Sequence, residues 1–279
     1  PSAYRNKSAR KKPAILFVGP VHGHEVEALT GLVNLMEIFE TGRDLRGRDQ
    51  SALQTLGRQC RLLIIPAGNP DGTARFEPRS LQGMSKDDVR FWGQGTWSDG
   101  TLCGWPDSKS QHPMTGDNVG FLGCYFNDRG VNPMHDEFFA PLSTEAPAIL
   151  QAAREEAPDL AVSLHSHELP PALLRPAYVP IEIQEAVLDV AQRCYALMDQ
   201  RGLPHGRPFA AEAERGRDPA AFNLTSALHH VSGAVSFTFE CPHGLSSATA
   251  CNATLQQILD MQLSLYEAMI RFALDLKPR

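Results

Sequence analysis

The sequence lacks the features that would place the protein in a membrane or on a nucleic acid. No stretch approaches the roughly 18 consecutive apolar residues that a membrane-spanning helix needs. Basic residues are not in excess either, since 26 Lys and Arg stand against 32 Asp and Glu, for a formal charge of −6. A chain with this balance has nothing that favours a nucleic acid or an anionic membrane surface. We therefore predict no membrane span and no nucleic-acid partner.

Cysteine is sparse and irregularly spaced. The six cysteines form no CxxC pair and no finger-like spacing, which argues against a metal site built from cysteine. Isolated cysteines are among the most buried residues and pack as small apolar side chains. We expect most of them to be buried free thiols.

The chain has enough length and apolar content for one sizeable domain. It has 279 residues, of which 42% are hydrophobic and 21% are charged. A chain of this size can bury roughly 75% of the surface that its unfolded form exposes, so it needs neither disulfides nor a partner to fold. We predict a single domain over residues 1–279. No signal-like apolar segment follows Pro1, so the compartment stays open. The sequence does not indicate the oligomeric state.

Short apolar runs alternate with longer amphipathic segments along the chain. The apolar runs show no polar alternation, which is typical of strands buried on both faces; they are 14–18, 61–66, 159–164 and 234–239. The amphipathic segments have helical length; they are 25–40, 145–157, 181–201 and 252–274. Strands alternating with helices predict a three-layer α/β/α sandwich around a mixed, largely parallel sheet.

One region, at about 80–123, breaks this alternation. Gly, Pro, Trp and Asp dominate it, and no clear period survives. We interpret it as a long loop insertion, because loops beyond about 15 residues are uncommon unless they are functional or disordered. Trp92, Trp97 and Trp105 all fall within it, which favours an ordered loop beside a site. A loop that only covers a sheet edge explains the pattern equally well.

Polar residues follow the end of each apolar run. The run at 14–18 leads into His22-Gly23-His24-Glu25, 61–66 leads into Asn69-Pro70-Asp71-Gly72, and 159–164 and 234–239 end at His165 and Glu240. In open α/β sheets, ligands bind beyond the carboxyl ends of the strands. These residues are therefore expected to converge.

The spacing of His22 and Glu25 is that of a possible metal-binding pair, but it is not specific. His165 and Glu168 have the same HxxE spacing, so spacing alone does not choose between the two pairs. A close pair with one distant ligand suits catalytic zinc, which takes three protein ligands and leaves a position for water. An ordinary polar loop residue remains the commoner explanation for a His or Glu at a strand end.

Four motifs in order resemble the zinc carboxypeptidase family, within the wider superfamily that includes the succinylglutamate desuccinylase and aspartoacylase relatives. They are His22-Gly23-His24-Glu25, Asn69-Pro70-Asp71-Gly72, Ser163-Leu164-His165-Ser166 and Phe237-Thr238-Phe239-Glu240. The similarity spans most of the chain. It implies that His22, Glu25 and His165 hold one Zn2+ ion, and it leaves His24 and Glu168 outside the ligand set.

The resemblance also assigns the catalytic groups. Glu240 matches the family's catalytic glutamate, which takes a proton from a zinc-activated water and passes it to the leaving nitrogen. The family places an arginine after Asn-Pro-Asp to stabilise the oxyanion, and Arg79 is preferred here over Arg75. A cation aimed at developing negative charge contributes several kcal/mol, comparable with one oxyanion-hole donor at about 3 kcal/mol.

The substrate-binding stretch departs from the family pattern. The family grips the terminal carboxylate with an Asn-Arg pair, and the corresponding residues here are Asn127 and Asp128, followed by Arg129. An aspartate repels a substrate carboxylate that an arginine would bind, unless Arg129 replaces it. The family's substrate-covering Tyr has no counterpart, because Phe222 is the nearest aromatic residue and lacks a hydroxyl.

These observations predict a zinc-dependent hydrolase of amide bonds that resembles the carboxypeptidases. Its substrate would be a peptide or an acylated amino acid. Asp128 suggests a substrate with an amino group near the scissile bond, such as a diamino acid of a cell-wall peptide. Two alternatives stay open: a deacylase of N-acyl amino acids with the same ligand set, and a non-catalytic relative that keeps the fold and the metal.

Overall fold

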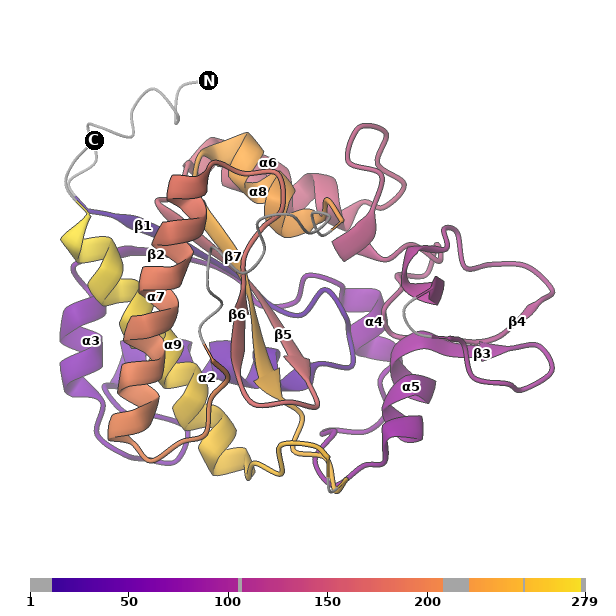
Figure 1. Ribbon diagram of the computed structural model, residues 1–279, viewed down its shortest axis with the longest axis horizontal. Coiled ribbons are helices and arrows are strands. Elements are labelled where there is room, and N and C mark those ends of the chain that lie inside the picture. Colours follow the sequence, from indigo (N-terminus) through magenta and orange to yellow (C-terminus); the bar gives the residue numbers. More distant parts are fainter. Residues whose placement is uncertain (1–11, 105–106, 208–220, 248, 277–279) are drawn as a thin grey trace.

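The computed structural model describes residues 12–104, 107–207, 221–247 and 249–276. Its centre is a five-stranded sheet in the order β2-β1-β5-β7-β6 (Figure 1). The strands are β1 (Ala14–Val18), β2 (Arg61–Ile65), β5 (Leu160–His167), β6 (Ala172–Leu174) and β7 (Val235–Pro242). The first three neighbouring pairs in this order are parallel, and β6 pairs with β7 in the antiparallel direction. The predicted mixed, largely parallel sheet is confirmed.

Helices cover both faces of the sheet, as the alternation of segments predicts. One face packs against α2 (Val26–Thr41), α7 (Ile181–Gln200) and α9 (Leu255–Asp275), and α3 (Ser51–Gly57) lies against α2 and α9. The other face packs against α6 (Glu145–Glu156) and α8 (Leu224–Ser232), at the top of Figure 1. These three layers form the expected α/β/α sandwich.

Alternate residues of the central strands enter two separate cores. In β5, Val162 and Leu164 join the core beneath α2, α7 and α9, whereas Ala161 joins the core beneath α6 and α8. Successive side chains of a strand point to opposite faces, so His165 shares the face of Ala161. In β7, Thr238 lies on the same face, where its hydroxyl bonds that of Thr225 in α8. A strand that is buried on both faces therefore has a nearly continuous apolar sequence.

The segment 80–123, expected as a long loop, carries secondary structure of its own. It contains α5 (Lys86–Gln94) and a small antiparallel sheet of β3 (Gly95–Trp97) and β4 (Val119–Leu122). The short 3-10 helix η2 (Asp107–Ser110) lies between these two strands in the chain. Figure 1 shows α5, β3 and β4 at the right, beside the edge of the domain at which α4 (Pro70–Arg75) lies. Trp105, one of the three tryptophans of this segment, lies outside the described residues.

Local sequence explains why this segment orders. Ser85 and Asp88 form a capping box at the start of α5, each side chain bonding the backbone N–H of the other. Phe91 of α5 stacks on Phe121 of β4 with ring centroids 4.7 Å apart and planes 7° apart. Trp92 meets both rings edge to face. These aromatic contacts attach the helix to the small sheet.

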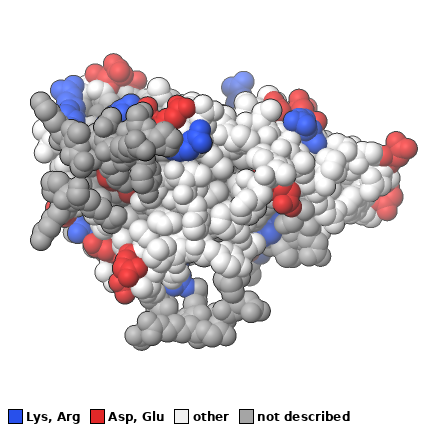
Figure 2. Space-filling view, turned by 90° about the horizontal axis from the view of Figure 1, so that it is seen from above, with Lys and Arg blue, Asp and Glu red and all other residues white. Residues whose placement is uncertain are grey.

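The remaining predictions about the whole chain concern thiols, membranes and charge. All six cysteines are free, and all but the half-buried Cys251 are buried, as expected. Among the described residues, none of the helices has both the length and the apolar character needed to cross a membrane. On the face drawn in Figure 2, basic and acidic side chains lie dispersed around a broad uncharged area.

Candidate metal centre

The carboxyl ends of the parallel strands bring distant polar residues to one edge of the sheet. β1 leads into the turn that carries His22 and Glu25, and β5 itself carries His165. His165 pairs in register with Glu240 on the neighbouring strand β7. Paired residues on adjacent strands about 4.8 Å apart present their side chains to the same face. The expected convergence of these residues is therefore seen in the structure.

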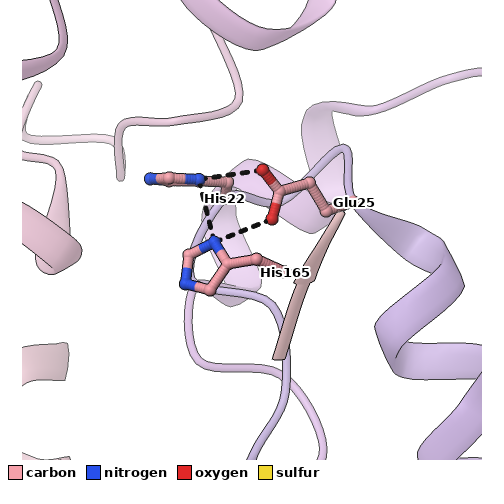
Figure 3. Close-up of side chains that lie close together, drawn as sticks. All are labelled: His22, Glu25 and His165. Carbon is pink, nitrogen blue, oxygen red and sulfur yellow. Dashed lines mark hydrogen bonds and ion pairs between the residues drawn. The ribbon is translucent and has the colours of Figure 1, made fainter. Parts of the chain in front are cut away.

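Two imidazoles and a carboxylate meet at this edge. The Nδ1 atom of His22 lies 2.9 Å from one oxygen of Glu25, and the Nδ1 atom of His165 lies 2.9 Å from the other (Figure 3). The two Nδ1 atoms are 3.2 Å apart. All three residues are buried, and their ligand atoms lie within 4.8 Å of one another.

Burial and mutual charge set the protonation of the cluster. Burial lowers the pKa of His22 from 6.5, although Glu25 opposes it. Burial also lowers the pKa of His165, but the charge of Glu25 and the hydrogen bond to it outweigh burial and raise that pKa. Burial alone would raise the pKa of Glu25. The charges of His22 and His165 and their hydrogen bonds to the carboxylate outweigh burial and hold this pKa well below its ordinary value. Glu25 is therefore a carboxylate at neutral pH.

This donor set fits a zinc ion. Two imidazole nitrogens and a carboxylate are a ligand set of catalytic zinc, and bonds of about 2.0 to 2.2 Å place tetrahedral ligand atoms roughly 3.3 to 3.6 Å apart. The separations of 2.9 to 3.2 Å in the cluster are a little shorter than that range. With both imidazoles neutral and their lone pairs on Nδ1, three electron-rich atoms would face one another, and a cation relieves their repulsion.

Glu25 occupies a special backbone position. It is the N-cap residue of α2, yet its side chain bonds none of the free N–H groups of that helix. Instead the carboxylate turns toward the histidines, and it also accepts a hydrogen bond of 3.2 Å from the backbone N–H of Ser166. The partial positive charge of a helix N-terminus stabilises an anion placed there. Both features favour the ionised form of Glu25.

Glu240 stands beside this cluster with one buried and unpartnered oxygen. The residue is half-buried, but its Oε2 atom is closed to solvent and bonds no described residue. Burial raises the pKa of Glu240 to about 7, His165 opposes that rise and Glu25 adds to it. A carboxyl group whose pKa lies near neutrality can both accept and donate a proton at physiological pH.

The Asn69-Pro70-Asp71-Gly72 motif holds the loops of the site together. Asn69 caps α4 by accepting from the N–H of Gly72, and its amide makes long hydrogen bonds of 3.4 Å to the carbonyls of Cys124 and Tyr125. The N–H of Gly23, within the His22 turn, donates to the same Cys124 carbonyl. A Cβ on Gly23 would lie 2.0 Å from the Gly72 backbone, and one on Gly72 would lie 2.4 Å from the Cys124 oxygen. Both close approaches require glycine.

A second buried acid lies behind Glu25. Glu27 is 5% exposed, and its carboxyl accepts from the hydroxyl of Ser166 and, at 3.4 Å, from the backbone N–H of Leu81. Ser166 therefore bonds Glu25 through its N–H and Glu27 through its hydroxyl. Burial raises the pKa of Glu27 to about 7. Glu27 is not among the functional residues predicted from the sequence.

The two arginine candidates occupy different environments. Arg75 is half-buried and donates to the carbonyls of Gly123 and Phe126 and to the Asp128 carboxylate, at 2.5 Å. Its donors therefore hold the loop 123–128 in place. Arg79 is exposed in the segment that follows α4, so the preference for Arg79 as an oxyanion stabiliser stays a prediction.

The predicted substrate-binding residues form a tight turn. Asn127 is 1% exposed, and its side chain accepts from the N–H groups of Arg129 and Val131 and donates to Glu145. The Asp128 side chain is 74% exposed and bonds Arg75. Arg129 is exposed. Asn127 thus shapes the turn, and the role of all three residues in substrate binding stays a prediction.

The other histidine and glutamate pairs lie outside the cluster. Glu168 pairs with Lys86 of α5 at 2.8 Å. The HxxE spacing also relates His24 to Glu27, and neither belongs to the group of potential ligands among the described residues.

Tyr125, which stacks on His22, is not among the functional residues predicted from the sequence. It carries no local signal, because its partner is distant in the chain.

Comparisons with known proteins agree with this fold. Neither the comparison with protein-family models nor that with curated proteins finds a match. Among solved structures, a metallo-carboxypeptidase from Burkholderia cenocepacia matches with a TM-score of 0.54 and 14% identity, over 94% of this chain and 57% of that one. Thrombin activatable fibrinolysis inhibitor matches with a TM-score of 0.56 and 13% identity, over 95% of this chain and 62% of that one.

A third structure is similar to the same extent. It is a metallo-carboxypeptidase from Pseudomonas aeruginosa in complex with (2-guanidinoethylmercapto)succinic acid, with a TM-score of 0.50 and 13% identity, over 94% of this chain and 57% of that one. The chain thus spans about three fifths of the length of these proteins. At such identities the likeness is one of fold, and the expected zinc carboxypeptidase-like fold is confirmed.

We expect Gly72→Ala to destabilise the protein, because the added methyl group would meet the Cys124 carbonyl and the Asn69 amide. Overpacking of this kind costs about 1 to 3 kcal/mol. Urea unfolding of the zinc-free protein measures it. Gly104→Ala is the matched control, since a Cβ there meets no described atom within 4 Å and an ordinary exposed substitution changes stability by less than about 0.5 kcal/mol. Equal midpoints for the two variants would contradict the proposed close contact.

Glu27 should make the stability of the zinc-free protein fall as pH rises. Its folded pKa of about 7 exceeds the ordinary 4.5, so the folded state holds the proton more tightly. The stabilisation is complete below pH 4.5 and is lost as pH rises through 7, at most about 3 kcal/mol in all. Relative to wild type, Glu27→Gln should gain stability over this range. Parallel pH curves of the two proteins in urea unfolding would refute the assignment.

Proposed function

We propose that the chain is a zinc-dependent hydrolase of amide bonds that acts like the carboxypeptidases. The observation that carries the proposal is the buried cluster of His22, Glu25 and His165 beside Glu240, on a fold shared with metallo-carboxypeptidases. His22, Glu25 and His165 would hold one zinc ion. Zinc in such a site lowers the pKa of a water molecule to about 7 and polarises a carbonyl group.

The chain's own residues would supply the proton transfers. Glu240, with a pKa near 7, would accept the proton of the attacking water. It would then pass the same proton to the nitrogen of the cleaved amide. General acid and base steps of this kind contribute about 100-fold to 10,000-fold in rate. Arg79 would stabilise the negative charge that develops on the carbonyl oxygen.

The substrate would be a peptide or an acylated amino acid. The turn of Asn127, Asp128 and Arg129 is proposed to contact it. Arg75 already bonds the carboxylate of Asp128, which weakens the hypothesis that Asp128 binds an amino group of the substrate. A second candidate is a deacylase of N-acyl amino acids with the same ligand set. The ion pair does not separate the two candidates, because both substrate classes carry a free carboxylate.

A substrate panel separates these candidates. The zinc-loaded protein is incubated with N-blocked dipeptides that have a free C-terminus, with peptides that contain a diamino acid, and with N-acylated single amino acids. Release of the C-terminal residue from peptides is the expected result. Cleavage of the acylated amino acids alone would favour the deacylase, and no cleavage of any class by zinc-loaded protein would favour the non-catalytic alternative.

Glu240→Gln should retain zinc and lose at least about 100-fold in turnover, because the amide can neither accept nor return the proton. Zinc content by elemental analysis and kcat on the substrate that wild type cleaves best are the two measurements. Glu168→Gln is the matched control, since this nearby glutamate is bound to Lys86; its kcat should stay within about threefold of wild type. An unchanged kcat in Glu240→Gln would eliminate the assigned role.

A further inference from the structure

The two histidines of the metal centre are held in different ways. The second ring nitrogen of His165, Nε2, lies 3.0 Å from the hydroxyl of the fully buried Ser163. The corresponding Nε2 atom of His22 is also buried but hydrogen-bonds no described residue, and it points away from Glu25 and His165 (Figure 3). A histidine that binds a metal almost always fixes its ring through a hydrogen bond at the second nitrogen. Within the part of the chain that the structure describes, His22 lacks such a bond.

An aromatic ring covers His22 instead. The ring of Tyr125 lies parallel to that of His22, with centroids 3.9 Å apart and planes only 15° apart. The final torsion of a histidine side chain is broad and has no deep staggered well, so an unbonded ring needs some other restraint. A flat ring in contact with its face limits that rotation, because turning the imidazole would drive an edge into the phenol.

Tyr125 is itself held from several directions. Its hydroxyl hydrogen-bonds the side chain of Gln94, at the end of α5. Its backbone N–H donates to the carbonyl of Gly93 at 2.9 Å, and its carbonyl accepts from the Asn69 amide at 3.4 Å. Burial, with the charges of Glu25 and Glu240, raises the pKa of Tyr125 well above 10. The phenol therefore stays neutral and adds no charge to the cluster.

We propose that Tyr125 is the positioning residue of His22: it orients the imidazole by stacking, in place of the hydrogen bond that Ser163 supplies to His165. The proposal rests on the zinc site of the proposed function. It assigns a role to the segment 80–123 as well, because Gln94 and Gly93 fix Tyr125 from that segment. Loss of an outer contact of this kind typically weakens metal binding 10-fold to 100-fold.

The test measures zinc affinity, by competition with a chromogenic chelator, in variants that remove or keep the flat ring. Tyr125→Met fills much of the space with a flexible chain and should bind zinc at least 10-fold more weakly than wild type, and Tyr125→Leu should do the same. Tyr125→Phe keeps the stacked ring without the hydroxyl and should bind within about threefold of wild type. The visible spectrum of the cobalt-substituted protein should change in the Met and Leu variants only, because it reports the ligand geometry.

Phe121→Leu is the matched control. It removes a parallel aromatic stack of similar geometry, on Phe91, within the same segment but on the small sheet. Its zinc affinity should equal that of wild type. Equal weakening in Phe121→Leu and Tyr125→Met would show that loosening of the segment, and not the stack on His22, governs affinity, and would overturn the proposal. Loss of cooperative unfolding in both Met and Leu variants would also overturn it.

The outcomes separate this inference from the proposed function. Wild-type protein that takes up no zinc would defeat the proposed function and this inference with it. Wild-type protein that binds one zinc, together with a Tyr125→Met variant of equal affinity and an unchanged cobalt spectrum, would defeat only the role of Tyr125.

Discussion

Two imidazole nitrogens and a carboxylate are held 2.9 to 3.2 Å apart in a buried place, and the surrounding structure is arranged to keep them there. The ionised Glu25 carboxylate lies between the two imidazoles, and its charge raises the pKa of His165. The parallel pairing of β1, β5 and β7 places their carriers at one sheet edge. The same pairing places Glu240 beside His165, where burial moves its pKa into the range of proton transfer.

Close backbone contacts hold the loops around the cluster in a fixed geometry. Gly23 and Gly72 let the His22 turn and the start of α4 meet at the Cys124 carbonyl. Arg75 donates hydrogen bonds to two backbone carbonyls of the loop that contains Cys124. Tyr125 belongs to the same loop, and its ring stacks on His22. The Asn69-Pro70-Asp71-Gly72 motif, one of the four that carry the family resemblance, therefore has a structural role. Its asparagine and glycine join the metal-binding turn to the loop that covers it.

Much of this fold is readable from local pattern, and the rest depends on contacts between distant residues. The apolar run at 14–18 coincides with β1, because a strand buried on both faces needs an unbroken apolar sequence. β6 escapes prediction because its three residues pair only at the sheet edge. The helix α5 does have a local signal in Ser85 and Asp88, which the surrounding Gly and Pro residues obscure. The ligand set came from a resemblance, since HxxE spacing alone did not choose it, and no pattern links Tyr125 to His22.

The central claim is that one zinc ion binds where His22, Glu25 and His165 meet. Its most direct test is an anomalous difference map, recorded at the zinc absorption edge from crystals of the protein grown with one equivalent of zinc. We expect a single strong peak about 2.0 to 2.2 Å from the Nδ1 atoms of both histidines and from a Glu25 oxygen. A peak bound elsewhere, or none between these three side chains, would contradict the account.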